Sequence, residues 1–243
     1  MSDNTFNLGT VIDDAKKVIT NPIEFYRNMP TEGGLSNPLI FVAVIGAITG
    51  LIISVYSIIG IGANNGMFAG GIAIGAIIVF PIMAVIGSFI GAAVIFVVWK
   101  LMGSDKTYEV AYRCTAYSFA IAPIVLLISF IPYIAGIIKT LWSCYLFYIA
   151  SIEVHKLKAQ TAKVVFGVFA VIGALMGVGS EHAARNFTNT FERAMSDSNI
   201  PEVFKDIENL EDMSPEEVGE KMGEFMKGLN KVLEEAEREA KEE

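Results

Sequence analysis

Five long apolar stretches constrain the fold more than any other feature of the chain. They lie near residues 38–61, 70–101, 107–130, 132–154 and 161–179. At about 1.5 Å per residue, each is long enough to cross a hydrocarbon core about 30 Å thick. Hydrophobic residues make up 53% of the 243 residues, which is above the share expected of a soluble domain. The pattern predicts an all-α polytopic membrane protein with five transmembrane helices.

The length of the second stretch and the short connection after the third stretch each predict a local feature of the backbone. The second is too long for one perpendicular span and too short for two, so we expect one helix that is tilted or kinked at Pro81. Between the third and fourth stretches only Ile131 is left as a connection. This predicts a tight hairpin at the membrane edge, with Pro132 as the first residue of the fourth helix.

Charge divides the chain into three regions. Residues 1–180 hold ten Lys/Arg and eight Asp/Glu, whereas residues 181–243 hold eight and eighteen. We expect a cytoplasmic amphipathic arm (1–37), a transmembrane domain (38–180) and an acidic helical tail outside the membrane (181–243). Basic residues occupy the arm and the loops after spans two and four, and the alternating loops have no charge. This predicts a multi-pass protein of the cell membrane, or of an endomembrane in a eukaryote, with its N-terminus cytoplasmic and its C-terminus outside.

The arm contains an amphipathic pattern followed by a helix-start motif. Apolar residues at helical spacing predict a helix on the inner membrane surface; these residues are Val11, Ile12, Ala15, Val18 and Ile19. Asn21 fits an N-cap, Pro22 fits the first helical position and Glu24 fits a capping box. Phe25 and Tyr26 suit the headgroup belt, so Asn21, Pro22, Phe25 and Tyr26 form a motif that leads the chain into the membrane. The main interpretation is a surface anchor; the alternative is a docking site for a partner.

The tail ends in a strongly marked helix. Ser214, Pro215, Glu216 and Glu217 combine an N-cap, a proline at the first position and a capping-box glutamate. An apolar stripe follows at alternating spacings of four and three: Val218, Met222, Phe225, Leu229, Val232 and Ala236. We expect this stripe to pack against other tail helices or a second copy of the chain, with a foreign partner as the alternative.

Residue patterns that carry chemistry are scarce. His155 and His182 have no carboxylate or cysteine at ligand spacing, and no phosphate-binding loop is present. The acidic balance without a basic face argues against nucleic acid. We therefore expect no enzymatic activity, no cofactor and no metal.

Lys139 is the one charge well inside a span. No acidic residue lies at matching depth, so the main interpretation is a side chain that reaches the outer interface. Arg113, near the start of the third span, is interpreted as an interface anchor. The alternative is that Lys139 and Arg113 mark a polar pathway.

Small residues predict close helix packing. Four GxxxG pairs lie in spans one, two and five: Gly46 and Gly50, Gly71 and Gly75, Gly87 and Gly91, and Gly173 and Gly177. In lipid, such pairs let helix backbones approach closely. Together they favour a tightly packed bundle.

The order of features resembles the Yip1 domain family over about residues 20–178. The resemblance rests on NPIEFYRNM in the arm and on several short motifs. These are Gly103–Tyr108, the pairs Ala116 with Tyr117 and Ala122 with Pro123, the turn Ile131–Gly136, the pair Leu141 and Trp142, and His155. It implies a five-helix membrane protein with a cytoplasmic N-terminus, and no catalytic residues are carried over.

In eukaryotes the family is associated with Golgi and ER membranes, Rab-type GTPases and membrane shaping. This chain has a short arm and an added acidic tail, which weighs against GTPase binding. We expect a non-enzymatic protein that organises the membrane or recruits protein partners. Its partners would be membrane lipids and another membrane protein, or a second copy through the C-terminal helix. The alternative is a small transporter or channel with its polar pathway near Lys139, in which Lys139, Arg113, Pro81 and Pro123 mark a pathway through broken helices.

Overall fold

The computed structural model describes residues 8–59, 69–196 and 214–242. Every element in these ranges is helical, which confirms the expected all-α fold. Five helices are long and apolar enough to cross a membrane: Ser36–Ile58, Gly75–Leu101, Tyr108–Leu127, Ile134–Glu153 and Ala159–Asn186. The chain forms two compact units, Met1–Val178 and Gly179–Glu243.

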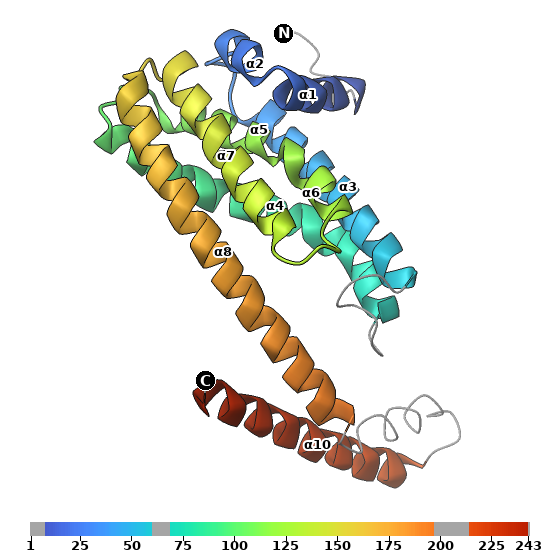
Figure 1. Ribbon diagram of the computed structural model, residues 1–243. Helices are drawn as coiled ribbons and strands as arrows, with labels where there is room; N and C mark the ends of the chain where they lie inside the picture. Colours follow the sequence, from blue (N-terminus) through green and yellow to red (C-terminus); the bar gives the residue numbers. More distant parts are fainter. Residues whose placement is uncertain (1–7, 60–68, 197–213, 243) are drawn as a thin grey trace. The chain divides into compact units, whose positions relative to one another are not determined.

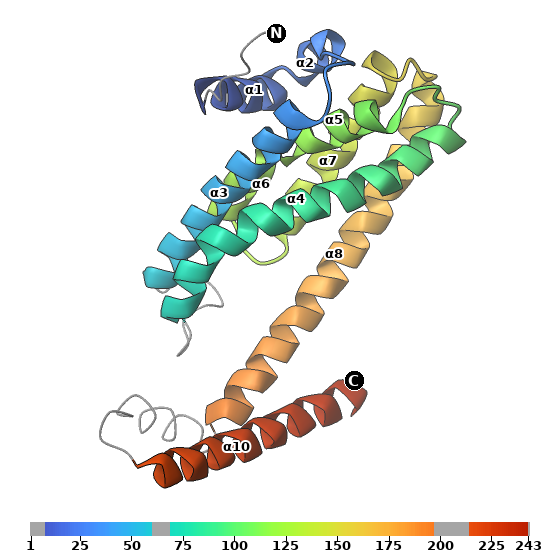
Figure 2. The same ribbon diagram turned by 180° about the vertical axis from the view of Figure 1, so that it is seen from behind.

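Figure 1 shows the helices in chain order. Their bounds are α1 (Leu8–Thr20), α2 (Pro22–Asn28), α3 (Ser36–Ile58), α4 (Ala69–Leu101), α5 (Tyr108–Ser118), the 3₁₀ turn η1 (Phe119–Ile121), α6 (Ala122–Leu127), α7 (Ile134–Glu153), α8 (Ala159–Ser196) and α10 (Pro215–Glu242). In both ribbon views α1 and α2 lie across one end of the helix bundle (Figures 1 and 2). We call α1 and α2 the cap.

The helices α3 and α4 form the most extensive helix–helix contact of the bundle, and small residues allow their close approach. A Cβ atom on Gly46 would lie 2.8 Å from the Cα atom of Pro81, so these two backbones are in direct contact. The helix α4 continues through Pro81, although proline cannot donate the backbone hydrogen bond of an interior helical residue. The second span is therefore one long helix, as the sequence predicts.

The third span is broken, and the connection after it is longer than expected. The helix α5 ends at Ser118, η1 forms one tight turn, and α6 restarts with Pro123 in its first turn. Residues 128–133 then link α6 to α7, which begins at Ile134. Tyr133 has a φ of +64°, a left-handed conformation that stops helical geometry from extending back to Pro132. The expected connection of Ile131 alone, with Pro132 opening the fourth helix, was wrong.

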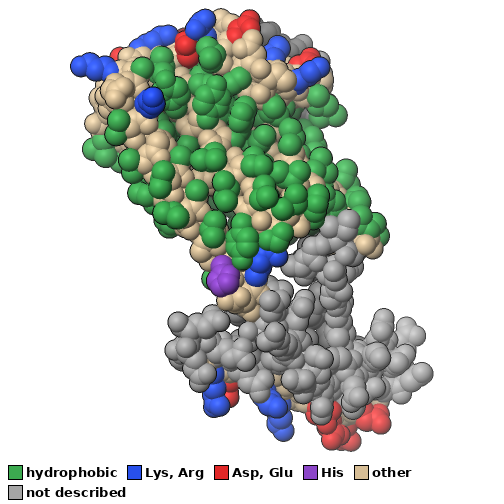
Figure 3. Space-filling model, viewed as in Figure 1, with side chains coloured by type: hydrophobic (Ala, Val, Ile, Leu, Met, Phe, Trp, Pro, Cys, Tyr) green, Lys and Arg blue, Asp and Glu red, His purple; other side chains and the backbone are tan. Residues whose placement is uncertain are grey.

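Apolar side chains cover the flank of the bundle, and charged side chains gather at its capped end (Figure 3). Many large apolar residues on α4 are exposed, including Ile78, Ile90 and Val97 at 62%, 62% and 55%. An exposed apolar patch of this extent on a soluble protein marks an interaction surface. On helices of this length, it is the surface that faces lipid tails.

Candidate functional site

The apolar stripe of α1 packs on the protein. Val11 is 8% exposed and Val18 is fully buried, and both belong to the main core cluster. Only part of the stripe, including Ile12 at 51% exposure, faces outward. The expected surface anchor is therefore covered mainly by the bundle, because the apolar face finds partners there.

The motif that leads into the membrane is a short helix at the predicted position. Asn21 is the N-cap of α2 and Pro22 is its first residue. The Asn21 amide donates a hydrogen bond to Glu24 Oε2, and the Asn21 side chain makes no cap bond to the helix backbone. The two side chains that were expected to cap α2 reciprocally thus bond to each other.

Of the two aromatic residues of this motif, Tyr26 is buried and Phe25 is partly buried, and both pack on α5. Tyr26 is 1% exposed, and its hydroxyl donates a 3.0 Å hydrogen bond to the carbonyl oxygen of Cys114 on α5. The Phe25 ring packs edge-on against Tyr117, with 4.9 Å between centroids. Burial raises the pKa of Tyr26 well above its ordinary value, so the hydroxyl remains a donor. These rings hold the cap to α5, whereas the sequence placed them among lipid headgroups.

An exposed ion pair joins the cap to the end of the fourth span. Arg27 Nε donates to Glu153 Oε2 and Arg27 Nη2 donates to Glu153 Oε1, each at 3.0 Å. Such two-pronged pairs fix geometry as well as charge. The end of α7 is therefore held against α2.

Arg113 forms a second joint, at the point where the chain enters α3. Its side chain is 3% exposed, and Nη2 donates a 2.6 Å hydrogen bond to the Gly34 carbonyl oxygen. Glu109 Oε1 accepts a 2.7 Å bond from the Gly34 backbone N–H and lies 3.4 Å from Arg113 Nη2. Gly33 and Gly34 have φ values of +109° and +76°, which favour glycine.

The structure does not bring Lys139 to Arg113. Arg113 lies near the start of α5 beside the cap, whereas Lys139 is exposed near the start of α7. The opposite end of α7 is the one that contacts the cap, through Glu153. Lys139 lies about 21 Å along the helix from Glu153, at about 1.5 Å per residue. A polar pathway made by these two residues has no geometric support in the described part of the chain.

The predicted packing glycines differ in how closely other helices approach them. Gly46 and Gly50 face α4 at close range, and a Cβ on Gly173 would lie 2.9 Å from Thr140 Cγ2. Gly91 has ordinary contact distance to Thr115, at 3.8 Å. Open space surrounds the Cβ positions of Gly75, Gly87 and Gly177. The surroundings of Gly71 lie outside the described residues.

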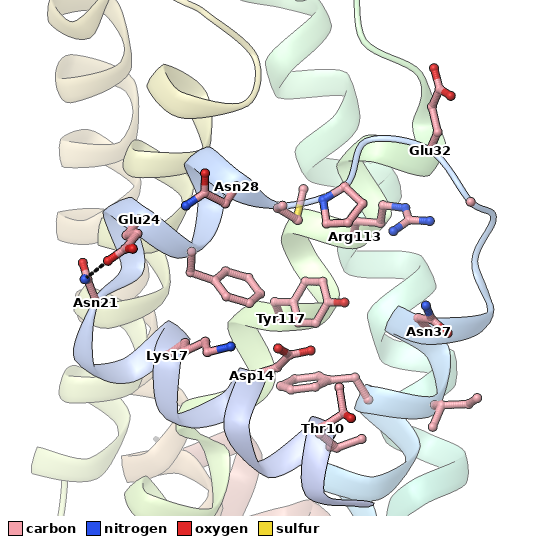
Figure 4. Close-up of a pocket in the computed structure, with 17 residues that line it drawn as sticks. Thr10, Asp14, Lys17, Asn21, Glu24, Asn28, Glu32, Asn37, Arg113 and Tyr117 are labelled. Atoms are coloured by element: carbon pink, nitrogen blue, oxygen red, sulfur yellow. Dashed lines mark hydrogen bonds between the residues drawn. The ribbon is translucent and has the colours of Figure 1, made fainter. Parts of the chain in front are cut away.

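Between the cap and the bundle lies a cavity of about 600 Å³ (Figure 4). Its walls come from α1, α2, the segment that leads into α3, the start of α3, and α5. Its charged lining residues are Asp14, Lys17, Glu24, Glu32 and Arg113, and its aromatic lining residues are Phe25, Phe41 and Tyr117. We call it the cap cavity. Sequence reasoning missed it because its walls are far apart in the chain.

His155 is a buried structural residue at the same end of the bundle. It is 3% exposed, its Nδ1 lies 2.6 Å from Ser104 Oγ, and its ring stacks on Trp99 at 4.0 Å. Trp99 in turn donates a 2.8 Å hydrogen bond to Ser151 Oγ. Burial lowers the pKa of His155 to about 4, and the positive charges of Lys106 and Lys100 act in the same direction. The neutral ring thus ties the loop after α4 to the end of α7.

The tail helix α10 begins as predicted and exposes apolar side chains. The Ser214 backbone N–H donates to Glu217 Oε2 at 2.8 Å, and the Glu217 N–H donates to Ser214 Oγ at 3.4 Å, which confirms the capping box. Met222, Met226 and Leu233 are 47%, 50% and 46% exposed. Of the predicted stripe, the side chains of Leu229, Val232 and Ala236 lie outside the described residues.

Across the part of the chain that the structure describes, no group of three or more His, Cys, Asp or Glu residues is placed to hold a metal ion. The histidine, cysteine and acidic side chains named above serve packing, helix capping and ion pairs.

Comparison with known protein families finds one family that matches the chain. The model of the family described as Yip1 domain matches residues 16–180, which is most of the chain and includes the end of α1, all of α2, the first four spans and most of the fifth. The match confirms the resemblance seen in the sequence motifs. No curated protein and no solved structure matches the chain.

Proposed function

The chain belongs to the Yip1 domain family, and from this premise we propose that it is a non-catalytic membrane scaffold that recruits protein partners through its tail helix α10. The five spans hold the protein in the bilayer, and the cap closes one end of the bundle. The tail helix supplies the recruiting surface.

The exposed apolar face of α10 is the observation that carries this proposal. Met222, Met226 and Leu233 follow helical spacing and are each about half exposed. Amphipathic helices present such a face to a groove or to another helix when they recognise a partner. Methionine is over-used on recognition surfaces because its side chain adapts its shape. The remaining face carries charged residues, which keep the unbound helix soluble.

We propose a cytoplasmic cap and an extracytoplasmic tail, in the cell membrane. Support comes from the basic residues that lie at the capped end of the bundle. Arg27 is tied to the end of α7, and Ser104 is hydrogen-bonded to His155. Lys100 is in the last turn of α4, Lys106 follows that helix, and Lys156 and Lys158 follow α7. Lys and Arg near span ends are retained on the cytoplasmic side.

Recruitment is tested by crosslinking in native membranes followed by affinity capture and mass spectrometry. The full chain is compared with a chain that ends at Gly179 and with the full-length variant Met226→Glu. We expect a specific set of proteins that is captured by the full chain and lost in both altered forms. Lys227→Glu is the matched control, because it adds negative charge at the neighbouring exposed position outside the apolar face. Equal capture by all four forms would overturn the proposal.

A further inference from the structure

The cap cavity has an aromatic side. Phe25 and Phe41 both pack edge-on against Tyr117, with centroid distances of 4.9 and 4.8 Å, and all three residues line the cavity. Aromatic rings attract cations, and they do so more strongly where water is excluded. This side of the cavity therefore suits an organic cation.

One acidic and one basic residue of α1 reach the cavity together. Asp14 and Lys17 are three residues apart on one face of α1 and both line the cavity, whereas Asp13 and Lys16 are exposed and do not. Figure 4 shows the Asp14 carboxylate beside the Tyr117 side chain and Lys17 on the same helix face. Burial raises the pKa of Asp14 above its ordinary value, with Lys17 only partly offsetting this. A cationic group next to Asp14 favours its charged form.

The remaining charges leave the cavity acidic. Arg113 already donates a hydrogen bond to the Gly34 carbonyl oxygen and forms an ion pair with Glu109. Its positive charge is therefore largely neutralised within the protein. Glu24 and Glu32 also line the cavity, and Lys17 is the other basic lining residue. The lining favours a ligand with a positive group for Asp14 and a negative group for Lys17.

The position of the cavity indicates where such a ligand comes from. Its walls include Asn37, Ile40 and Phe41 in the first two turns of α3, and Arg113 and Tyr117 in the second and third turns of α5, so it lies at the capped ends of two membrane-spanning helices. Lipid headgroups lie at this depth. The volume of about 600 Å³ is in the usual range for small-ligand sites.

We propose that the cap cavity binds the headgroup of an aminophospholipid, with its primary ammonium at Asp14 beside the aromatic side and its phosphate at Lys17. In such a headgroup two carbons separate the charges, and side chains three residues apart on a helix are about 5–6 Å apart at Cβ. A primary ammonium donates hydrogen bonds to a carboxylate, whereas a choline group cannot. Phosphatidylethanolamine is therefore preferred over phosphatidylcholine and over anionic phosphatidylglycerol. The site is independent of partner recruitment by α10.

The test is native mass spectrometry of the full chain in detergent with each of the three lipids added in turn. We expect phosphatidylethanolamine to bind about tenfold more tightly than the other two, the size of one charge-assisted hydrogen bond. Asp14→Asn should remove this preference, and Asp13→Asn, with the same charge change on the same helix, should retain it. Lys17→Gln should weaken binding of all three lipids, and Lys16→Gln should not.

Two further arms separate folding and ligand source. Thermal unfolding of each variant is measured first, and Asp14→Glu, which keeps the charge, should retain the preference if Asp14→Asn does not fold. Soluble phosphoethanolamine is added as a competitor. Competition by this solute without enrichment of the lipid would overturn the lipid assignment. Equal binding of the three lipids, or equal losses for Asp14→Asn and Asp13→Asn, would overturn the site.

Discussion

Gly50 of α3 lies so close to Ala76 of α4 that a Cβ atom on Gly50 would be 2.5 Å from the Ala76 carbonyl oxygen. The backbone of α4 occupies the space that a side chain would need. Backbone atoms cannot rotate away as a flexible side chain can. The spans α3 and α4 are therefore held at a separation that only glycine permits at position 50.

Gly50→Ala should destabilise the bundle by about 1–3 kcal/mol, the usual cost of overpacking. Unfolding in mixed micelles with increasing SDS measures the effect. Gly87→Ala is the matched control, because open space surrounds its Cβ position. Alanine is the better helix former, so the control should be neutral or slightly stabilising. Equal destabilisation by both substitutions would contradict the α3–α4 contact.

Tyr26→Phe should loosen the cap. The substitution removes the hydrogen bond to the Cys114 carbonyl oxygen and keeps the buried ring, so a loss of about 1 kcal/mol is expected. Hydrogen exchange of α1 and α2 amides should accelerate, whereas α7 amides should be unaffected. Tyr145→Phe serves as the control, because Tyr145 is 41% exposed. Unchanged exchange in the cap would show that the bond does not hold it.

Stability should fall in mild acid because of His155. The folded-state pKa of about 4 is below the ordinary value of 6.5, so folding favours the neutral ring. The full contribution of His155 to the free energy of unfolding is present above pH 6.5 and is lost as the pH falls toward 4. Below pH 4 this contribution does not change further. The loss is about 3 kcal/mol at 1.4 kcal/mol per pH unit.

The difference in thermal unfolding between pH 7 and pH 4.5 measures this loss in detergent. His155→Gln cannot titrate in this range, so the variant should be less stable at pH 7 and should show a smaller pH dependence. The same pH dependence in both proteins would assign the acid sensitivity to other groups.

Sequence reasoning predicted the five spans because hydropathy and length are local properties. The capping box of α10 was predictable for the same reason, since Ser214 and Glu217 are three residues apart. The break in the third span, where Pro123 stands at the restart, was considered only in the transporter alternative, and the main interpretation had one continuous helix. The apolar composition around Pro123 is continuous, so hydropathy alone shows no interruption.

The cap and its cavity could not be predicted from local patterns. Tyr26 and Cys114 are far apart in the sequence and are brought together by the fold. The amphipathic periodicity of α1 predicts an apolar face but does not indicate whether lipid or protein covers that face. Arg113 was interpreted as an interface anchor because sequence shows its depth but not its partners. Its bond to Gly34 depends on how the segment before α3 crosses α5, whereas Glu109 is a partner four residues away on the same helix.

The orientation is tested with introduced cysteines and a membrane-impermeant maleimide on intact cells. Lys16→Cys, in the cap, should be labelled only after permeabilisation, and Lys227→Cys, in α10, should be labelled without it. The background is low because Cys114 and Cys144 lie within membrane-spanning helices. Labelling of both sites from the same side would contradict a five-span topology.

The most direct test of the scaffold function is photocrosslinking from single positions of α10 in native membranes. A photoreactive amino acid is placed at Met226, on the exposed apolar face, and in a second protein at Lys227 beside it. The account predicts discrete adducts with another protein from position 226 that are absent or much weaker from position 227. Identical adducts from both positions, or adducts with a second copy of the chain alone, would contradict recruitment through α10.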